Sequence, residues 1–89
     1  MRAVITVVGK DSVGILAKVS GACAKYKVNV NEVSQTILSD MFCMIMICDI
    51  GQMTINLTEF SDDLSRVGDD MGMKIHVMHE DVFNSMHRI

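Results

Sequence analysis

The sequence contains no proline and no tryptophan, and it has only three phenylalanines against nine methionines. The absence of proline, together with 49% hydrophobic residues, excludes a disordered chain and suits a compact two-layer domain. With so few aromatic residues, the methionines must fill the core, where their flexible side chains adapt to irregular gaps and to partners. The 89 residues predict one domain, 1–89, whose marginal stability a partner would improve.

Long apolar runs are also missing. No segment reaches the roughly 18 to 20 apolar residues that a membrane span needs. The first ten residues, MRAVITVVGK, lack the long apolar core and the small-residue cleavage site of a signal peptide. We therefore expect a cytoplasmic protein that does not bind membranes.

Basic residues and cysteines are few. Eight lysines and arginines, not clustered, in a chain of formal charge -3 give no electrostatic footprint for nucleic acid. The three cysteines, Cys23, Cys43 and Cys48, form no CxxC pair, so neither a disulfide framework nor a zinc site is indicated. We expect all three to be small core residues, with Cys43 and Cys48 facing opposite ways on one strand.

Signals of metal binding and catalysis are absent as well. His76 and His79 are an odd number of residues apart on an expected strand, so they face opposite ways, and adding His87 does not complete a ligand set. No nucleophile adjoins a base, and GKDSVG lacks the GxxxxGK[ST] spacing of a phosphate loop. We expect no enzyme, no cofactor and no metal. The acidic row Glu59, Asp62 and Asp63 is typical of a solvated helix face.

The first half of the chain predicts strand, helix and strand. Residues 2–8 are almost entirely apolar, as in a strand covered on both faces. From Val13 the apolar period changes to three and four residues, which indicates an amphipathic helix of about 13 residues. The helical stripe consists of Ile15, Leu16, Val19, Ala22, Cys23 and Tyr26. Residues 28–38 alternate as a strand, with a phase slip that predicts a bulge around Asn31 and Glu32.

The second half repeats this order. Ser39 and Asp40 predict a tight hairpin turn, and MFCMIMICDI then predicts a strand buried on both sides. Asn56 followed by Glu59 has the form of a helix start with a reciprocal cap, and Gly72 is a typical helix end. The apolar face of this helix is Leu57, Phe60, Leu64, Val67 and Met71.

Residues 73–78 alternate as a half-exposed fourth strand, and Asp81 is expected to cap a short terminal helix. The apolar side of that helix is Val82, Phe83, Met86 and Ile89. Two strand-helix-strand units in sequence predict an α+β, ferredoxin-like βαββαβ sandwich. Its four-stranded antiparallel sheet carries two helices on one face, and the short C-terminal helix follows the last strand.

Such a sheet leaves one face without helices. Two of its strands are apolar on both sides, so the uncovered face would be wider than soluble monomers usually tolerate. A second copy, an edge-to-edge extension of the sheet or another protein must therefore cover it.

The turn GKDSVG joins the first strand to the first helix. Backbone N–H groups at a helix start have no internal partner, so they can hold a carboxylate or phosphate. Gly9 and Gly14 permit close approach, Lys10 adds charge, and the Asp11 carboxylate suits the ammonium group of a zwitterion. Asn29, at the head of the second strand, offers both a donor and an acceptor. The alternative is purely structural, with Asp11 or Ser12 as a helix cap and the glycines as turn residues.

The residues VITVVGKDSVGIL, the following helix, VNVNEVSQTI and the hydrophobic third strand resemble the ACT domain family over nearly the whole chain. More narrowly, the short length, the GKDxVGI turn, the NVxxxSQT strand and the VFxxMxxI tail resemble small bacterial and archaeal ACT proteins that stand alone. The chain is more distantly similar to the ACT repeats of the glycine-cleavage repressor.

The resemblance implies a regulatory module that binds an amino acid at a subunit interface. Carried over by position, the ligand-binding residues would be Gly9, Lys10, Asp11, Ser12, Val13, Gly14 and Ile15 of one subunit, opposite Asn29 and Val30 of its neighbour. Serine-binding ACT loops carry histidine and asparagine where this chain has Gly9 and Asp11, so serine specificity does not transfer.

Two hypotheses of function follow from the sequence. The first is a non-catalytic, homodimeric sensor that binds a small amino acid and transmits occupancy to a protein partner. The second is a protein-interaction or assembly module that binds no ligand. Two copies side by side would form one eight-stranded sheet, whereas two copies back to back would cover the face without helices, and dimers pairing into tetramers remain an open alternative.

Overall fold

The first strand, β1, covers Arg2–Lys10 and lies in the interior of a four-stranded sheet. The structure is a computed structural model, and it describes residues 1–10 and 13–86. The strand ends two residues later than the sequence predicts, because Gly9 and Lys10 still pair with the hairpin beside them. One of its faces is fully buried, with Ala3, Ile5 and Val7 all at 0% exposure.

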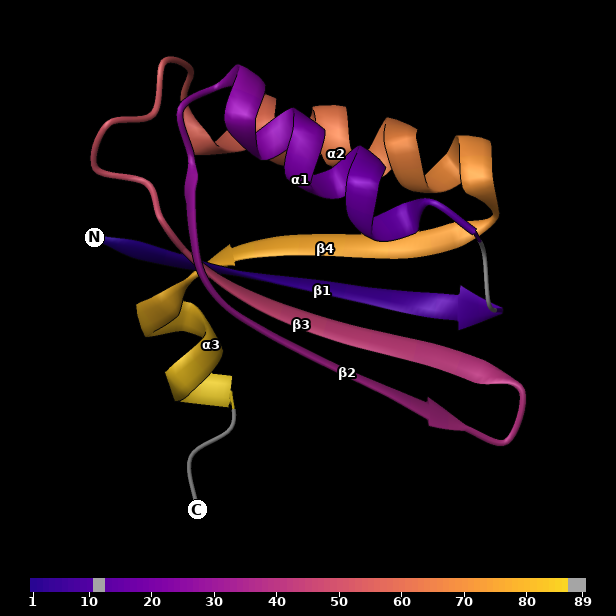
Figure 1. Ribbon diagram of the computed structural model, residues 1–89. Coiled ribbons are helices and arrows are strands. Elements are labelled where there is room, and N and C mark those ends of the chain that lie inside the picture. Colours follow the sequence, from indigo (N-terminus) through magenta and orange to yellow (C-terminus); the bar gives the residue numbers. More distant parts are fainter. Residues whose placement is uncertain (11–12, 87–89) are drawn as a thin grey trace.

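Three further strands complete the sheet: β2 (Asn29–Leu38), β3 (Met41–Asp49) and β4 (Met73–His79). Their order is β2-β3-β1-β4, and every neighbouring pair is antiparallel (Figure 1). The predicted bulge is confirmed, since the register between β2 and β3 shifts between Val30 and Glu32. The predicted turn is confirmed too, with Ser39 in a left-handed conformation at φ 59°.

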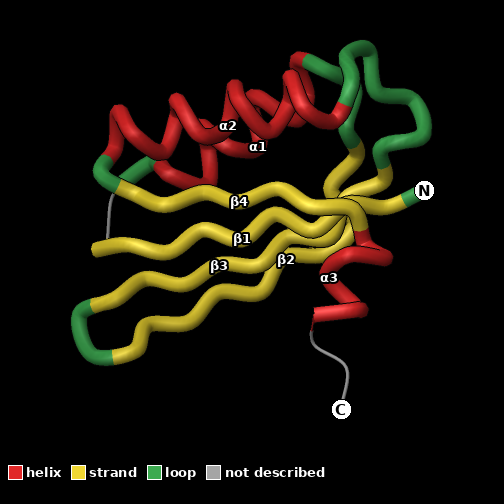
Figure 2. The backbone as a smooth tube through the Cα atoms, turned by 180° about the vertical axis from the view of Figure 1, so that it is seen from behind, coloured by secondary structure: helices red, strands yellow, loops and turns green. Residues whose placement is uncertain are grey.

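The two long helices, α1 (Ile15–Lys25) and α2 (Leu57–Met71), lie on the same side of the sheet, and the short α3 (Glu80–Met86) lies on the other (Figures 1 and 2). This arrangement confirms the predicted α+β, ferredoxin-like βαββαβ fold. Among the described helices, none combines the length and the apolar character that a membrane crossing requires.

Helix α1 is shorter than predicted because the residues expected to form its first turn, from Val13, are not helical. Gly14 is the N-cap residue and adopts a left-handed conformation, with φ 86°, so the helix begins at Ile15. The predicted stripe is confirmed at Ile15, Val19 and Cys23, which are buried. Leu16 remains 38% exposed.

Helix α2 begins and ends where the sequence predicts. The Asn56 side chain accepts a hydrogen bond from the Glu59 N–H at 2.8 Å and donates one to the Glu59 carboxylate at 2.8 Å. Gly72 ends the helix in a left-handed conformation with φ 69°. Both caps satisfy backbone groups that a helix leaves without internal partners.

Helix α3 begins differently from the prediction. Asp81 does not precede the helix but lies in its first turn, after Glu80. The Asp81 N–H donates to Nδ1 of His79 at 3.1 Å, so an imidazole rather than a carboxylate satisfies that amide. The expected apolar contribution of Ile89, like His87, lies outside the described residues.

The core lies between the sheet and the two long helices. It centres on the fully buried Phe60, Leu64, Met44 and Met46. The prediction that residues 41–50 are buried on both sides is wrong for a single chain. Every second residue of β3 is buried, whereas Ile45, on the opposite face, is 43% exposed.

The cysteines also divide between the two faces of the sheet. Cys23 and Cys48 are buried in the core and Cys43 is half-buried on the other face of β3, which confirms that Cys43 and Cys48 face opposite ways. A hydrogen bond shared with Cys23 and burial in the core raise the pKa of the Cys48 thiol far above its usual value. Buried thiols of this kind are inert packing residues.

Candidate functional site

The turn after β1 exposes its described residues to solvent. Lys10 and Gly14 are exposed and Val13 is 98% exposed, although Val13 is apolar. The predictions for Asp11 and Ser12 concern residues outside the described part of the chain. A single exposed apolar side chain is common on protein surfaces, so Val13 alone does not mark a binding site.

At the start of α1, no side chain within residues 1–10 and 13–86 caps the first backbone amides. Gly14 accepts the first helical hydrogen bond from the Lys18 N–H at 3.0 Å, so the amides of Ile15, Leu16 and Ala17 lie before the first helical donor. No described side chain caps them, whereas Asn56 caps α2. Amides in this position, with the positive end of the helix dipole, attract a carboxylate or another anion.

Two of the predicted ligand residues are committed to packing within the chain. A Cβ atom on Gly9 would lie 2.5 Å from Met73 Sδ and 3.2 Å from the Gly72 carbonyl oxygen, so β4 occupies the space that a side chain would need. The Ile15 side chain is buried at 3% exposure. Ile15 therefore offers a ligand its backbone amide and not its side chain.

The other predicted residues, Asn29 and Val30, begin β2, level with the start of β1 and so at the opposite end of the sheet from the turn. Asn29 pairs with Asp49, and Asp49 pairs with Arg2 at the start of β1. At about 3.3 Å per residue, the length of β1 separates Asn29 from Lys10 by roughly 26 Å. One chain therefore does not bring the two halves of the predicted site together.

The outer edge of the sheet next to Asn29 is open. All residues of β2 from Asn31 to Leu38 are exposed, including the apolar Val33 at 42% and Ile37 at 61%. Glu32 is the only charged residue on this strand. An exposed strand edge with so little charge is a template for pairing with another strand.

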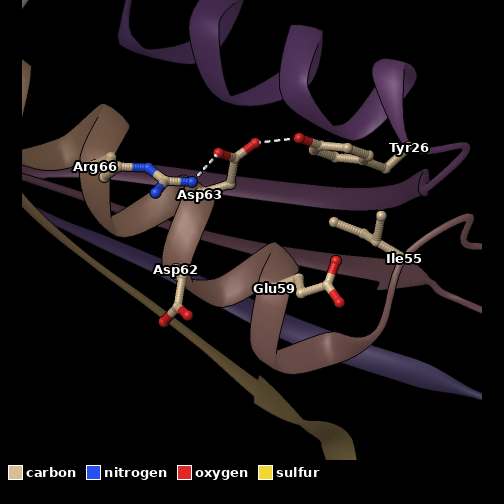
Figure 3. A pocket seen from close by; sticks show the side chains of 6 residues that line it. All are labelled: Tyr26, Ile55, Glu59, Asp62, Asp63 and Arg66. Carbon is tan, nitrogen blue, oxygen red and sulfur yellow. Dashed lines mark hydrogen bonds and ion pairs between the residues drawn. The ribbon is translucent and has the colours of Figure 1, made fainter.

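A separate hollow of about 290 Å³ lies between the end of α1 and the first half of α2 (Figure 3). Its lining residues are Tyr26, Ile55, Glu59, Asp62, Asp63 and Arg66. In Figure 3 the Asp63 carboxylate lies between its two partners, accepting from the Tyr26 hydroxyl and from Arg66 Nη2 at 2.6 Å.

The Tyr26 hydrogen bond, followed by the Arg66 hydrogen bond, holds the pKa of the Asp63 carboxyl below its usual value. The Tyr26 ring also meets Phe60 edge-on, with centroids 6.0 Å apart. The sequence does not reveal this link, because Tyr26 belongs to the apolar stripe of α1 and Asp63 to the acidic row of α2. The Tyr26 hydrogen bond connects the end of α1 to α2, whereas Arg66 and Asp63 both belong to α2, and we assign the hollow a structural role.

Metal-ligating groups are not gathered in the described part of the chain. Within residues 1–10 and 13–86, no three His, Cys, Asp or Glu side chains are placed to share an ion. His76 is exposed on the face without the long helices, and His79 contacts the start of α3.

Comparison with known proteins identifies close relatives. Residues 2–78 match the ACT domain family. A UPF0237 protein of Listeria monocytogenes is 47% identical over 89 residues, covering all of both chains. A UPF0237 protein of the archaeon Methanopyrus kandleri is 38% identical over 88 residues, covering 99% of this chain and 98% of the other.

Two solved structures show the same architecture. The ACT domain protein from Streptococcus pneumoniae has a TM-score of 0.82 and 33% identity, over 98% of each chain. A protein assigned as a glycine cleavage system transcriptional repressor has a TM-score of 0.72 at 20% identity, over 89% of this chain and 47% of that one, and shares the fold.

Proposed function

Because the chain belongs to the ACT domain family of ligand-binding regulatory modules, we propose that it is a non-catalytic, homodimeric sensor of a small amino acid. The ligand lies between the two subunits, and its occupancy is transmitted to a protein partner. The observation that carries this proposal is the start of α1, whose first backbone amides no described side chain caps, beside the exposed Val13 and Gly14. Amides in this position can hold a carboxylate.

The topology explains why the site needs two copies. Strands β1 and β2 run in the same direction, because both are antiparallel to β3. If the β2 strands of two copies pair antiparallel, Asn29 of one copy arrives at the sheet end that carries the turn of the other. Its strand is then three strand spacings, roughly 14 Å, from β1, with β3 and β2 between them, so side chains and a small ligand must span this distance across the surface of the sheet.

The exposed side chains of β2 favour this pairing. Val33 and Ile37 pair with Met46 and Phe42, which face the helices, so they lie on the helix side of the edge. In an antiparallel pair these apolar residues of two copies are buried between the two α1 helices, together with the exposed Leu16. The backbone groups along the edge gain hydrogen-bond partners at the same time.

Each end of a zwitterion has a partner of suitable chemistry. The α1 amides attract the α-carboxylate from the helix side of the sheet. By the register, Lys10 and Asn29 lie on the other face, so their side chains must reach around the end of β1 and the edge of β2 to contact the ligand. The exposed Val13 covers the apolar part of a small side chain. The predicted role of the Asp11 carboxylate, binding the α-ammonium group, belongs to the same proposal.

A thermal-shift screen of the twenty amino acids tests ligand binding. A ligand that binds only the folded dimer stabilises it by about 2.7 kcal/mol at one hundred times its dissociation constant, so one or two amino acids should raise the melting temperature. Replacing Gly14 by Asn, which tolerates the left-handed conformation, should block the site and abolish the shift. Gly72→Asn is the matched control, since it has the same backbone conformation at the far end of α2.

The second candidate function is an assembly module without a ligand. It is favoured by the packing of Gly9 against Met73 and by the separation of the two half-sites within one chain. No shift with any amino acid at millimolar concentration, in a protein that still dimerises, would support this second function and contradict the first.

A further inference from the structure

Burial along β1 is uneven on the face of the sheet that carries neither α1 nor α2, called the free face below. Val4 and Val8 lie on this face, because their alternating neighbours Ile5 and Val7 belong to the core on the other face. Val4 is 2% exposed, whereas Val8 is 37% exposed. Val4 is not among the residues that form the core, so an element on the free face buries it.

Helix α3 is that element. It follows β4 directly, and its main contacts are with β1 and β4, on the side of the sheet away from α1 and α2 (Figures 1 and 2). Val4 pairs with Met78, one residue before the end of β4, so it lies beside the start of α3. Val8 lies four residues further along β1, roughly 13 Å away, and remains exposed.

The helix is weakly attached to the sheet. None of its seven residues is buried. Val82 is 51% exposed and Met86 is 66% exposed, which leaves the half-buried Phe83 as its apolar contact. A helix this short is not stable in water unless packing holds it, and elements with few buried contacts open more easily than the core.

A two-bond ion pair fixes α3 to β1. Arg2 donates from Nε and Nη2 to the two carboxylate oxygens of Glu80, each at 2.6 Å. The side chains are 47% and 26% exposed, so solvent screens the pair. Arg2 also pairs in the register with Asp49 of β3, and directly paired side chains share a face. Arg2 therefore keeps an acidic neighbour when Glu80 moves away.

We propose that α3 is a releasable cover of the free face, held closed by the pair between Arg2 and Glu80. On release, α3 detaches and unfolds as a unit, while the sheet, α1 and α2 stay folded. Val4 then joins the exposed Val8 and Ile45 in one apolar strip. Grouped apolar side chains of this kind mark an interaction surface, so α3 makes an autoinhibitory contact that controls access to it.

The cover is independent of the proposed amino-acid site. Neither Arg2 nor Glu80 belongs to that site, and Val4 lies on the opposite side of the sheet from the start of α1. An experiment on the cover therefore succeeds or fails whether or not the chain binds an amino acid.

Thiol labelling tests whether α3 covers Val4. In a Cys43→Ser background the two remaining native cysteines are buried, so an added thiol reacts first with a small alkylating reagent. The Val4→Cys variant should be labelled at least about tenfold more slowly than Val8→Cys, because α3 must open before the reagent reaches it. Equal rates at the two positions would overturn the proposal.

A second experiment tests the ion pair. Arg2→Gln and Glu80→Gln should each raise the labelling rate of Val4→Cys about three- to tenfold and leave that of Val8→Cys unchanged. Adding about 0.5 M NaCl should raise the Val4→Cys rate when the pair is intact, because salt screens it, but not in the Glu80→Gln variant. Labelling of Val4→Cys that responds neither to the substitutions nor to salt would contradict the proposed role of the pair.

Two controls separate release of α3 from a general loss of stability. Arg66→Gln removes a comparable ion pair, with Asp63 on α2, and should leave the labelling rate of Val4→Cys unchanged. The urea dependence of that rate should be much weaker than the urea dependence of global unfolding, since only a short segment opens. A slope equal to that of global unfolding, or an Arg66→Gln effect as large as that of Arg2→Gln, would show that α3 is not released on its own.

Discussion

The Asp63 carboxylate shows how one side chain connects two helices. It accepts hydrogen bonds from Tyr26 at the end of α1 and from Arg66 one turn along α2. Its side chain is 26% exposed, so solvent screens the pair with Arg66, and the neutral hydroxyl of Tyr26 is the larger cause of its lowered pKa. The contact stabilises the packing of α1 on α2 more strongly when Asp63 is ionised than when it is protonated.

The lowered pKa of Asp63 predicts a pH-dependent contribution to stability. Because the folded state binds the proton less tightly than the unfolded chain, the contribution is complete above the ordinary value of about 4 and is lost as the pH falls below it. Tyr26→Phe removes the larger cause while keeping the ring against Phe60. We expect the variant to melt below the wild type at pH 7, with a difference that shrinks toward pH 3.

Thermal unfolding at several pH values measures this difference. Asp63→Asn is the control, because a Tyr26→Phe substitution added to it should show no pH-dependent difference. If the melting temperatures of Tyr26→Phe and the wild type differ as much at pH 3 as at pH 7, the hydroxyl acts through packing alone.

Most boundaries of the secondary-structure elements follow from local signals in the sequence. The Asn56 cap, the Gly72 end of α2 and the bulge in β2 were all predicted, because each depends on residues a few positions apart. The start of α1 and the start of α3 were predicted less well. At Asp81 a histidine from the preceding strand takes the role of the cap, an arrangement that only the folded chain creates.

Gly68 shows a tertiary constraint that the helical pattern does not reveal. It lies in α2 directly above β4, where an added Cβ atom would be 2.7 Å from the Met73 carbonyl oxygen and 3.0 Å from the Ile75 side chain. Gly21 on α1 has no neighbour within 4 Å of such an atom. The first glycine lets the helix approach the sheet, and the second has no contact that requires glycine.

We therefore expect opposite effects of the same substitution at these positions. Gly68→Ala should lower the free energy of unfolding by about 1 to 3 kcal/mol, because the backbone of β4 must move. Gly21→Ala should raise it by up to about 1 kcal/mol, through better helix propensity. Urea unfolding measures both values. Equal stabilisation by the two substitutions would show that α2 does not pack this closely on β4.

At the scale of the whole molecule, the order of elements predicts the fold, but not how the chain completes its site. The strand-helix-strand repeats suffice for the sheet order and for the placement of α1 and α2. The exposure of Ile45 agrees with the prediction that one apolar face of the sheet carries no helices, although the apolar composition of β3 alone does not tell burial within a chain from burial between chains. The distance between Asn29 and the turn follows only from the register of three paired strands, and the sequence does not provide that register.

In the proposed dimer, each ligand site combines the turn of one subunit with β2 of the other. Mixing two variants that do not bind tests this directly. Gly14→Asn blocks the turn and Asn29→Ala removes the side chain on β2, so neither homodimer has an intact site. A mixed dimer has one intact site, built from the turn of one variant and the β2 strand of the other.

Equal amounts of the two variants are unfolded and refolded together. Calorimetry then measures how many molecules of the amino acid found in the thermal-shift screen bind per dimer. Random pairing makes half of the dimers mixed, and one of their two sites is intact, so binding should return to about a quarter of the wild-type sites. A refolded mixture that binds no ligand, or a single variant that binds as the wild type does, would contradict a site shared between subunits.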